Sequence, residues 1–295
     1  MTRFAPVYRA LGLILMLFGL TLLVPMLVSH FNNDGAEWVY DEVFLLTVLC
    51  GTFLWYRYRN TRRDLSVRDG FLLVVLVWTV LPAFSALPFM IHLQMSHTDA
   101  YFEAVSALTV SGGTVMSGLD QLPMSINLRR HLMQWLGGMG LIVLVVAILP
   151  MLGIGGRQML QAEIPGPMKD NRLTPRVTET AKGLWLIYIA ITIACSVAYR
   201  WAGMGWFDAI CHAFSTVSLG GFSTHDASLG YFNSQAIEWI CIVFMLFSGI
   251  NYATHFLALS GRSVLAYGRD PEAGWFVGVL LVSAFVIANY IWKEG

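Results

Sequence analysis

The chain has 295 residues, of which 57% are hydrophobic and 12% are charged, and its mean hydropathy is +0.64. A soluble domain carries about a quarter charged residues, so this composition excludes a soluble globular enzyme. The 18 Lys and Arg balance the 18 Asp and Glu, which leaves no net basic charge for binding nucleic acid. The four cysteines are far apart and form no CxxC pair, which argues against a disulfide scaffold and against a zinc site.

Apolar stretches long enough to cross a bilayer recur along the chain. A transmembrane helix needs about 20 consecutive apolar residues. We predict seven spans without Asp, Glu, Lys or Arg, and the second, shortest span relies on interfacial anchoring at its ends. They are residues 10–29, 43–56, 71–98, 132–156, 183–199, 239–261 and 273–292.

The distribution of basic residues predicts how these spans are oriented. If the amino terminus is cytoplasmic, all but four of the 18 Lys and Arg face the cytoplasm, as the positive-inside rule requires. The four on the outer side are Arg129, Arg130, Arg200 and Lys293. We therefore predict a cytoplasmic amino terminus and an outer carboxyl terminus. Arg129 and Arg130 are expected to anchor the chain to lipid headgroups.

Two further apolar segments, residues 99–118 and 208–224, are too interrupted to be spans. Each begins with Asp-Ala, continues for about ten helix-compatible residues and then breaks at Thr, Ser and paired glycines. A ten-residue helix is about 15 Å long, which is half the bilayer core. We predict two re-entrant half-helices, with Asp99 and Asp208 capping their outer ends.

The two segments resemble an internal repeat, but their alignment is open. A shift of 109 positions superposes Gly112 on Gly221 and aligns the expected helices. A shift of 107 instead superposes the Thr-Val-Ser triplets at 109–111 and 216–218. The sequence does not decide which glycines are equivalent.

Irregular backbone at membrane depth is tolerated where protein buries it or where it lines a watery cavity. The carboxyl end of a half-helix carries partial negative charge, and extended glycine-rich backbone can replace the hydration shell of a cation with carbonyl oxygens. The pattern therefore predicts a cation-conducting pore. Its expected ion-binding residues are Thr109, Val110, Ser111, Gly112, Gly113, Thr216, Val217, Ser218, Leu219, Gly220 and Gly221.

Other interpretations of these segments remain open. One Gly-rich break alone would indicate an ordinary loop, and only the second copy in a matching context favours a pore. Glu103 is interpreted as a cap or loop anchor, and His212 as a packing or hydrogen-bonding residue. A sodium- or proton-coupled cation symporter is the alternative function, although the spans lack the charged residues typical of proton relays. No cluster suited to a membrane enzyme is found, and an assembly subunit is a further possibility.

The run WLGGMGLIVLVVAILPMLGIGG at 135–156, followed by AEIPGP at 162–167, closely resembles the TrkH/TrkG potassium-uptake family. Residues 106–120 and 215–223 resemble the first two filter loops of that superfamily, which includes KtrB. The resemblance covers essentially the whole chain. It implies an all-α polytopic membrane protein built from outer helix–pore helix–filter–inner helix units, four around one pore, of which about two are present here.

The resemblance also implies a division of the chain. Residues 1–68 form an amino-terminal two-helix extension, 69–156 a first pore repeat, 157–182 a cytoplasmic linker, 183–262 a second pore repeat and 263–295 the outer helix of a third. On this mapping we expect the chain to be a truncated form or fragment of a longer protein.

The function implied by the resemblance is channel-like potassium uptake across the cytoplasmic membrane, with potassium held only by the filter residues. No cofactor is expected in this chain, and nucleotide is expected only on a regulatory partner. The implied partners are the lipid bilayer, a second copy in a homodimer and a cytosolic TrkA-type nucleotide-binding subunit.

Overall fold

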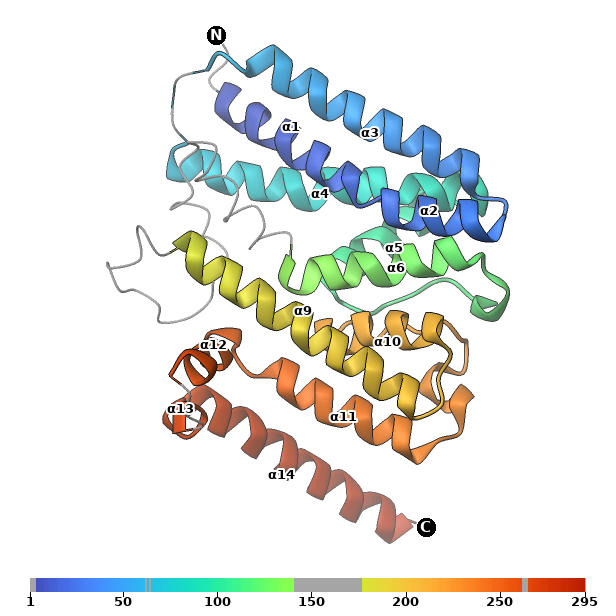
Figure 1. Cartoon of the computed structure of the whole chain (residues 1–295), viewed down its shortest axis with the longest axis vertical. Helices are drawn as coiled ribbons and strands as arrows, with labels where there is room; N and C mark the ends of the chain where they lie inside the picture. The colour runs from blue at the N-terminus through green and yellow to red at the C-terminus, as the bar shows by residue number, and fades with distance from the viewer. Residues whose placement is uncertain (1–3, 62, 64, 141–176, 262–264, 295) are drawn as a thin grey trace.

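The computed structural model describes residues 4–61, 63, 65–140, 177–261 and 265–294. Every regular element in these ranges is a helix (Figure 1), which confirms the predicted all-α class. The α-helices are α1 Ala5–Leu20, α2 Leu23–Asn32, α3 Glu37–Tyr58, α4 Val67–His92, α5 His97–Thr109, α6 Met124–Trp135, α9 Val177–Trp201, α10 Trp206–Ser218, α11 Gln235–Gly249, α12 Tyr252–Ser260, α13 Leu265–Arg269 and α14 Pro271–Glu294. Short turns of helix are η1 Leu119–Gln121, the π-helical η2 Leu136–Gly140 and η3 Ser228–Phe232.

Five helical stretches in the described ranges are long and apolar enough to cross a membrane. They correspond to the first, second, third, fifth and seventh predicted spans. The second predicted span is part of the 22-residue helix α3, so the helix is longer than its apolar centre. The fourth predicted span continues beyond Gly140 and therefore lies mostly outside the described residues, as does most of the predicted linker.

The sixth predicted span, residues 239–261, is not one continuous helix. Helix α11 ends at Gly249, Ile250 is extended with ψ 144°, and α12 begins at Tyr252. His255 contributes to this break, because its Nε2 lies 2.9 Å from the Phe247 carbonyl oxygen, which within the chain otherwise accepts only the Ile250 N–H at 3.2 Å among the described residues. The prediction of an unbroken helix was wrong here because a tertiary contact replaces the helical hydrogen bond.

Figure 1 shows α6 lying between the amino-terminal helices and helices α9 and α10. The buried apolar side chains form two clusters, and α6 contributes to both. One cluster joins α1 to α5 with α6, and the other joins α9, α10 and α11. Phe222, from the loop after α10, belongs to the first cluster although its helix belongs to the second. The two halves of the described chain are therefore interlocked at this loop.

Helices α5 and α10 are the predicted half-helices, and each has 13 residues. At 1.5 Å per residue each is about 20 Å long, too short to cross the bilayer core. Their N-caps are Ser96 and Gly205, so the assignment of Asp99 and Asp208 as caps needs correction. Both acids lie in the first helical turn, where a negative charge interacts favourably with the positive end of the helix dipole. Ser96 is the actual cap of α5, because its Oγ accepts a hydrogen bond from the Asp99 N–H at 3.1 Å.

Candidate selectivity filter

Both half-helices end in the same backbone turn. Val110, directly after α5, has φ +58°, and Leu219, directly after α10, has φ +62°. Two residues further on, Gly112 has φ +76° and Gly221 has φ +77°. A positive φ at every second residue belongs to neither helix nor strand, and it explains why a glycine is needed at the second position of each turn.

Backbone hydrogen bonds give the same alignment of the two turns. The Ser111 N–H donates to the Ser106 carbonyl oxygen at 3.0 Å, and the Gly220 N–H donates to the Ser215 carbonyl oxygen at 2.7 Å. These residues are 109 positions apart, like the helix ends and the left-handed residues. The shift of 109 is therefore correct, and the first glycine of one pair corresponds to the second glycine of the other.

This alignment corrects part of the predicted filter. Thr216, Val217 and Ser218 were expected to be ion-binding filter residues, but they form the last turn of α10 and are buried. Contacts to neighbouring helices hold this turn, because the Tyr199 and Thr216 hydroxyls lie 2.7 Å apart and the Tyr252 hydroxyl donates to the Val217 carbonyl oxygen at 3.4 Å. The irregular backbone of the second loop begins only at Leu219.

The carbonyl oxygens of the two loops fall into two groups. The Gly113 carbonyl accepts a hydrogen bond from Ser106 Oγ at 2.5 Å, and the Gly220 carbonyl accepts one from Gln134 Nε2 at 2.7 Å. In the described part of the chain, no hydrogen-bond donor reaches the other carbonyls of residues 110–113 and 219–221. These carbonyls belong to Val110, Ser111, Gly112, Leu219 and Gly221.

The two loops lie against one another although they are far apart in sequence. A Cβ atom added to Gly112 would be 2.5 Å from the carbonyl oxygen of Gly220. Because α5 and α10 both end at this point, the negative ends of two helix dipoles are brought together. The structure thus places both predicted loops at one shared site.

Gln134 of α6 holds the second loop, and sequence reasoning missed this residue. Its Oε1 accepts a hydrogen bond from Ser215 Oγ at 2.7 Å, and its Nε2 donates to the Gly220 carbonyl. A Cβ on Gly220 would lie 2.4 Å from the Gln134 carboxamide, which explains the glycine there without any need for a positive φ. The only signal in the sequence was one amide within an apolar stretch.

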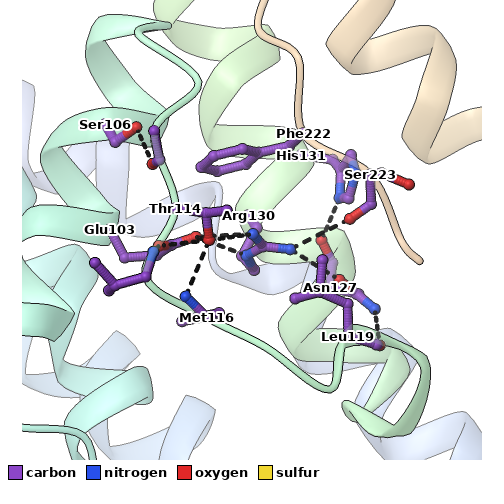
Figure 2. A network of polar contacts seen from close by, with 12 residues as sticks. Glu103, Ser106, Thr114, Met116, Leu119, Asn127, Arg130, His131, Phe222 and Ser223 are labelled. Carbon is purple, nitrogen blue, oxygen red and sulfur yellow. Dashed lines mark hydrogen bonds and ion pairs between the residues drawn. The ribbon is translucent and has the colours of Figure 1, made fainter. Parts of the chain in front are cut away.

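A buried ion pair holds the first loop (Figure 2). Glu103 of α5 and Arg130 of α6 are both inaccessible to solvent and lie 2.8 Å apart. The Glu103 carboxylate also accepts hydrogen bonds from Thr114 Oγ1 at 3.0 Å and from the Val115 N–H at 3.2 Å. The interpretation of Glu103 as a loop anchor is confirmed.

Arg130 also reaches the loop of the second repeat (Figure 2). Its Nη1 donates to the Ser223 carbonyl oxygen at 3.4 Å, and its guanidinium carbon lies 4.4 Å from the centre of the Phe222 ring. One side chain therefore contacts both loops. The expectation that Arg130 and its neighbour Arg129 bind lipid headgroups was wrong, because both are fully buried. Helix α6 begins at Met124, ahead of the charge-free stretch from which its span was predicted.

His212 occupies the position of Glu103 in the second repeat. Its Nε2 lies 3.1 Å from the Ser223 hydroxyl, and Ser223 is the counterpart of Thr114. Its Nδ1 lies 2.9 Å from the Asp208 carbonyl oxygen, one turn earlier in α10. The packing and hydrogen-bonding interpretation of His212 is confirmed. Each half-helix thus anchors its own loop from the same position, with a carboxylate in one repeat and an imidazole in the other.

The fold and this site define a class, namely polytopic helical membrane proteins in which re-entrant half-helices end in matching loops at a common site. The chain belongs to the TrkH family of cation transport proteins, which matches residues 40–270. The resemblance noted in the sequence is thereby confirmed.

Individual relatives agree with this assignment. The chain is 49% identical over 292 residues to the Trk system potassium uptake protein TrkH of Salmonella typhimurium, covering 98% of this chain and 60% of that protein. It is 52% identical over 285 residues to the TrkH of Vibrio parahaemolyticus, covering 95% and 59%. The crystal structure of the potassium transporter TrkH from Vibrio parahaemolyticus matches with a TM-score of 0.82 at 47% identity, covering 95% of this chain and 57% of that one. The chain thus spans about 60% of the length of the curated relatives it matches.

Replacing Gln134 with leucine is expected to destabilise the protein by about 1–3 kcal/mol, because the Gly220 carbonyl and the Ser215 hydroxyl lose their buried partner. Thermal melting of the purified protein in detergent measures the loss. Gln121→Leu is the matched control, since Gln121 is exposed in η1. Equal melting temperatures for the two variants would contradict the role of Gln134.

Proposed function

We propose that this chain forms the first part of a channel-like potassium uptake protein in the cytoplasmic membrane, the translocating subunit of a Trk-type system. The observation that carries the proposal is the meeting of two half-helices whose loops have the same left-handed turn. The names of the relatives, potassium uptake proteins and a potassium transporter, support potassium as the ion.

We infer that the filter uses the loop carbonyls that have no hydrogen-bond donor in the described ranges, with the exposed Thr109 at the carboxyl end of α5, directly before the first loop. They offer oxygens in place of the water molecules that potassium loses on entry. Gly113 and Gly220 shape the loops instead, because their carbonyls are engaged by Ser106 and Gln134.

The proposed driving force is the membrane potential. A negative cell interior favours inward movement of a cation by about 2.3 kcal/mol per 100 mV. The carboxyl ends of α5 and α10 offset part of the cost of removing water from the ion at the filter. Neither effect requires a cofactor in this chain.

The remaining features of the proposal concern topology and assembly. The amino terminus is cytoplasmic, and α1 to α3 form an extension that precedes two pore repeats. The proposed assembly is a homodimer that binds a cytosolic TrkA-type regulatory subunit, and nucleotide binds to that subunit only. A sodium- or proton-coupled symporter is less well supported, because the buried carboxylate of Glu103 is held by an ion pair and a loop N–H.

The function is tested by rubidium influx into potassium-starved cells that lack other potassium uptake systems and express the protein as its natural gene encodes it. We expect influx that follows the membrane potential and persists when no sodium or proton gradient is imposed. Influx that requires either gradient would favour the symporter and would overturn the channel-like mechanism.

A further inference from the structure

Beyond the filter loops, the two repeats exchange a reciprocal set of polar contacts between residues 118–120 and 225–226. Asp120 Oδ1 lies 2.5 Å from His225 Nδ1, and Asp120 Oδ2 accepts a hydrogen bond from the Asp226 N–H at 3.3 Å. In return, the Asp226 carboxylate accepts hydrogen bonds from the N–H groups of Gly118 at 3.0 Å and Leu119 at 3.2 Å. The aspartate carboxylate of each segment therefore accepts hydrogen bonds from backbone N–H groups of the other segment. We call this set of contacts the outer clasp.

One aromatic ring stacks on His225, and a carboxylate lies near each of its two nitrogens. Its ring stacks on Tyr231 with the ring centres 3.5 Å apart and the planes 6° apart. Its Nε2 lies 3.5 Å from Asp208 Oδ1, which also accepts a hydrogen bond from Thr224 Oγ1 at 2.8 Å. The histidine thus bridges Asp120 of the first repeat and the first turn of α10 in the second.

The outer clasp complements the inner tie made by Arg130. Arg130 joins the loops at Ser223, inside the protein, and the clasp joins them a few residues further along each chain. Two ties at different depths fix both the separation and the relative rotation of the segments between them. The Gly112 and Gly221 turns lie directly before the inner tie along each loop, between it and the carboxyl ends of α5 and α10.

We propose that Asp120 and His225 are positioning residues that set the ion selectivity of the filter by holding its two described loops in register. The inference rests on the proposed function, because selectivity in a carbonyl-lined filter depends on the arrangement of its oxygens. Neither side chain touches the ion. Loss of the pair is expected to relax discrimination between ions and to leave conduction in place.

The test compares uptake of rubidium and sodium by cells expressing Asp120→Asn or His225→Gln in the protein as its natural gene encodes it. We expect the rubidium-to-sodium ratio to fall about two- to fivefold, the range of one partly exposed ion pair. The double variant Asp120→His/His225→Asp keeps the pair and the net charge, and is expected to restore most of the ratio. Asp41→Asn is the matched control, because Asp41 pairs with His30 on the surface at 3.2 Å.

The outcomes separate this inference from the proposed function. An unchanged ratio in both single variants, with uptake retained, overturns the clasp as a selectivity device. If the ratio falls and the exchanged pair does not restore it, the inference is also overturned. The loss of a charge at the pore mouth would then be enough to explain the lower ratio. Absence of rubidium uptake by the unaltered protein overturns the proposed function and the inference with it. If one single variant fails to accumulate, the other and the exchanged pair decide the question.

A pH dependence follows for the clasp. Hydrogen bonds from His225 and from the Asp226 N–H lower the pKa of Asp120. Other titratable groups facing the pair are Asp208, Asp226, His212 and Tyr231. Because the pKa is lower in the folded protein, the stabilisation is complete above the ordinary aspartate value of about 4 and is lost as the pH falls through the lowered value. The melting temperatures of wild type and Asp120→Asn should therefore differ at pH 5 and converge below pH 4. A difference that disappears between pH 7 and 5 would contradict the assignment.

Discussion

Substitution of Gly112 by alanine is expected to reduce rubidium uptake at least about tenfold, a change equivalent to about 1.4 kcal/mol. Two effects combine at this position. The φ of +76° is unfavourable for any residue with a Cβ, and that Cβ would lie 2.5 Å from the Gly220 carbonyl oxygen. Since Gly220 belongs to the other repeat, the substitution forces the two loops apart. Rubidium influx, normalised to the amount of protein in the membrane, measures the effect.

Gly118 provides the matched control for this experiment. Its φ is +72°, but an added Cβ would meet nothing within 4 Å. Gly118→Ala therefore carries the backbone cost without the clash and should keep most of the uptake. If the two variants lose uptake equally, the close approach of the loops is not what matters, and the proposed shared filter site is contradicted.

Replacing Arg130 by methionine is expected to lower the free energy of unfolding by about 3–5 kcal/mol, because it leaves the buried carboxylate of Glu103 without its partner. The substitution also removes the tie to Ser223 in the second loop, so rubidium uptake should be lost as well. Chemical denaturation of the purified protein measures the stability. Arg59→Met is the control, since Arg59 is exposed at the end of α3.

A double-mutant cycle separates the charge from the anchoring role. In Glu103→Gln/Arg130→Met the buried charge is absent, and the glutamine oxygen can still accept a hydrogen bond from Thr114 or from the Val115 N–H. Part of the stability should therefore return. If the double variant is as unstable as the sum of the two single variants, the ion pair contributes no coupling, and another contact of Arg130 must account for the loss.

The half-helices could be predicted from sequence because their signals are local. Asp-Ala at the start, a short apolar run and a glycine pair at the end are all visible within each segment. The alignment of the two segments could not be predicted, because identical Thr-Val-Ser triplets fall on different structural positions. The triplet at 216–218 ends a helix, whereas the one at 109–111 enters the turn. Only backbone conformation distinguishes them.

The residues that hold the two loops of the proposed filter were missed because their partners are distant in sequence. Arg130 pairs with Glu103, 27 positions away, and Gln134 binds the Gly220 carbonyl, 86 positions away. The positive-inside rule predicted that Arg130 lies at the membrane surface. The sequence does not show that the buried carboxylate of Glu103 faces Arg130. The break after α11 was missed for a similar reason, because His255 supplies its support from the following helix.

The different anchors of the two loops have a consequence for how such a pore can change. In a channel built from identical subunits, one substitution alters every part of the ring at once. Here the first loop is anchored by Glu103 and the second by His212, within a single polypeptide. In the proposed filter, a mutation can therefore alter one loop while the other keeps its geometry, so that ion permeation can be adjusted in smaller steps than in a symmetric assembly.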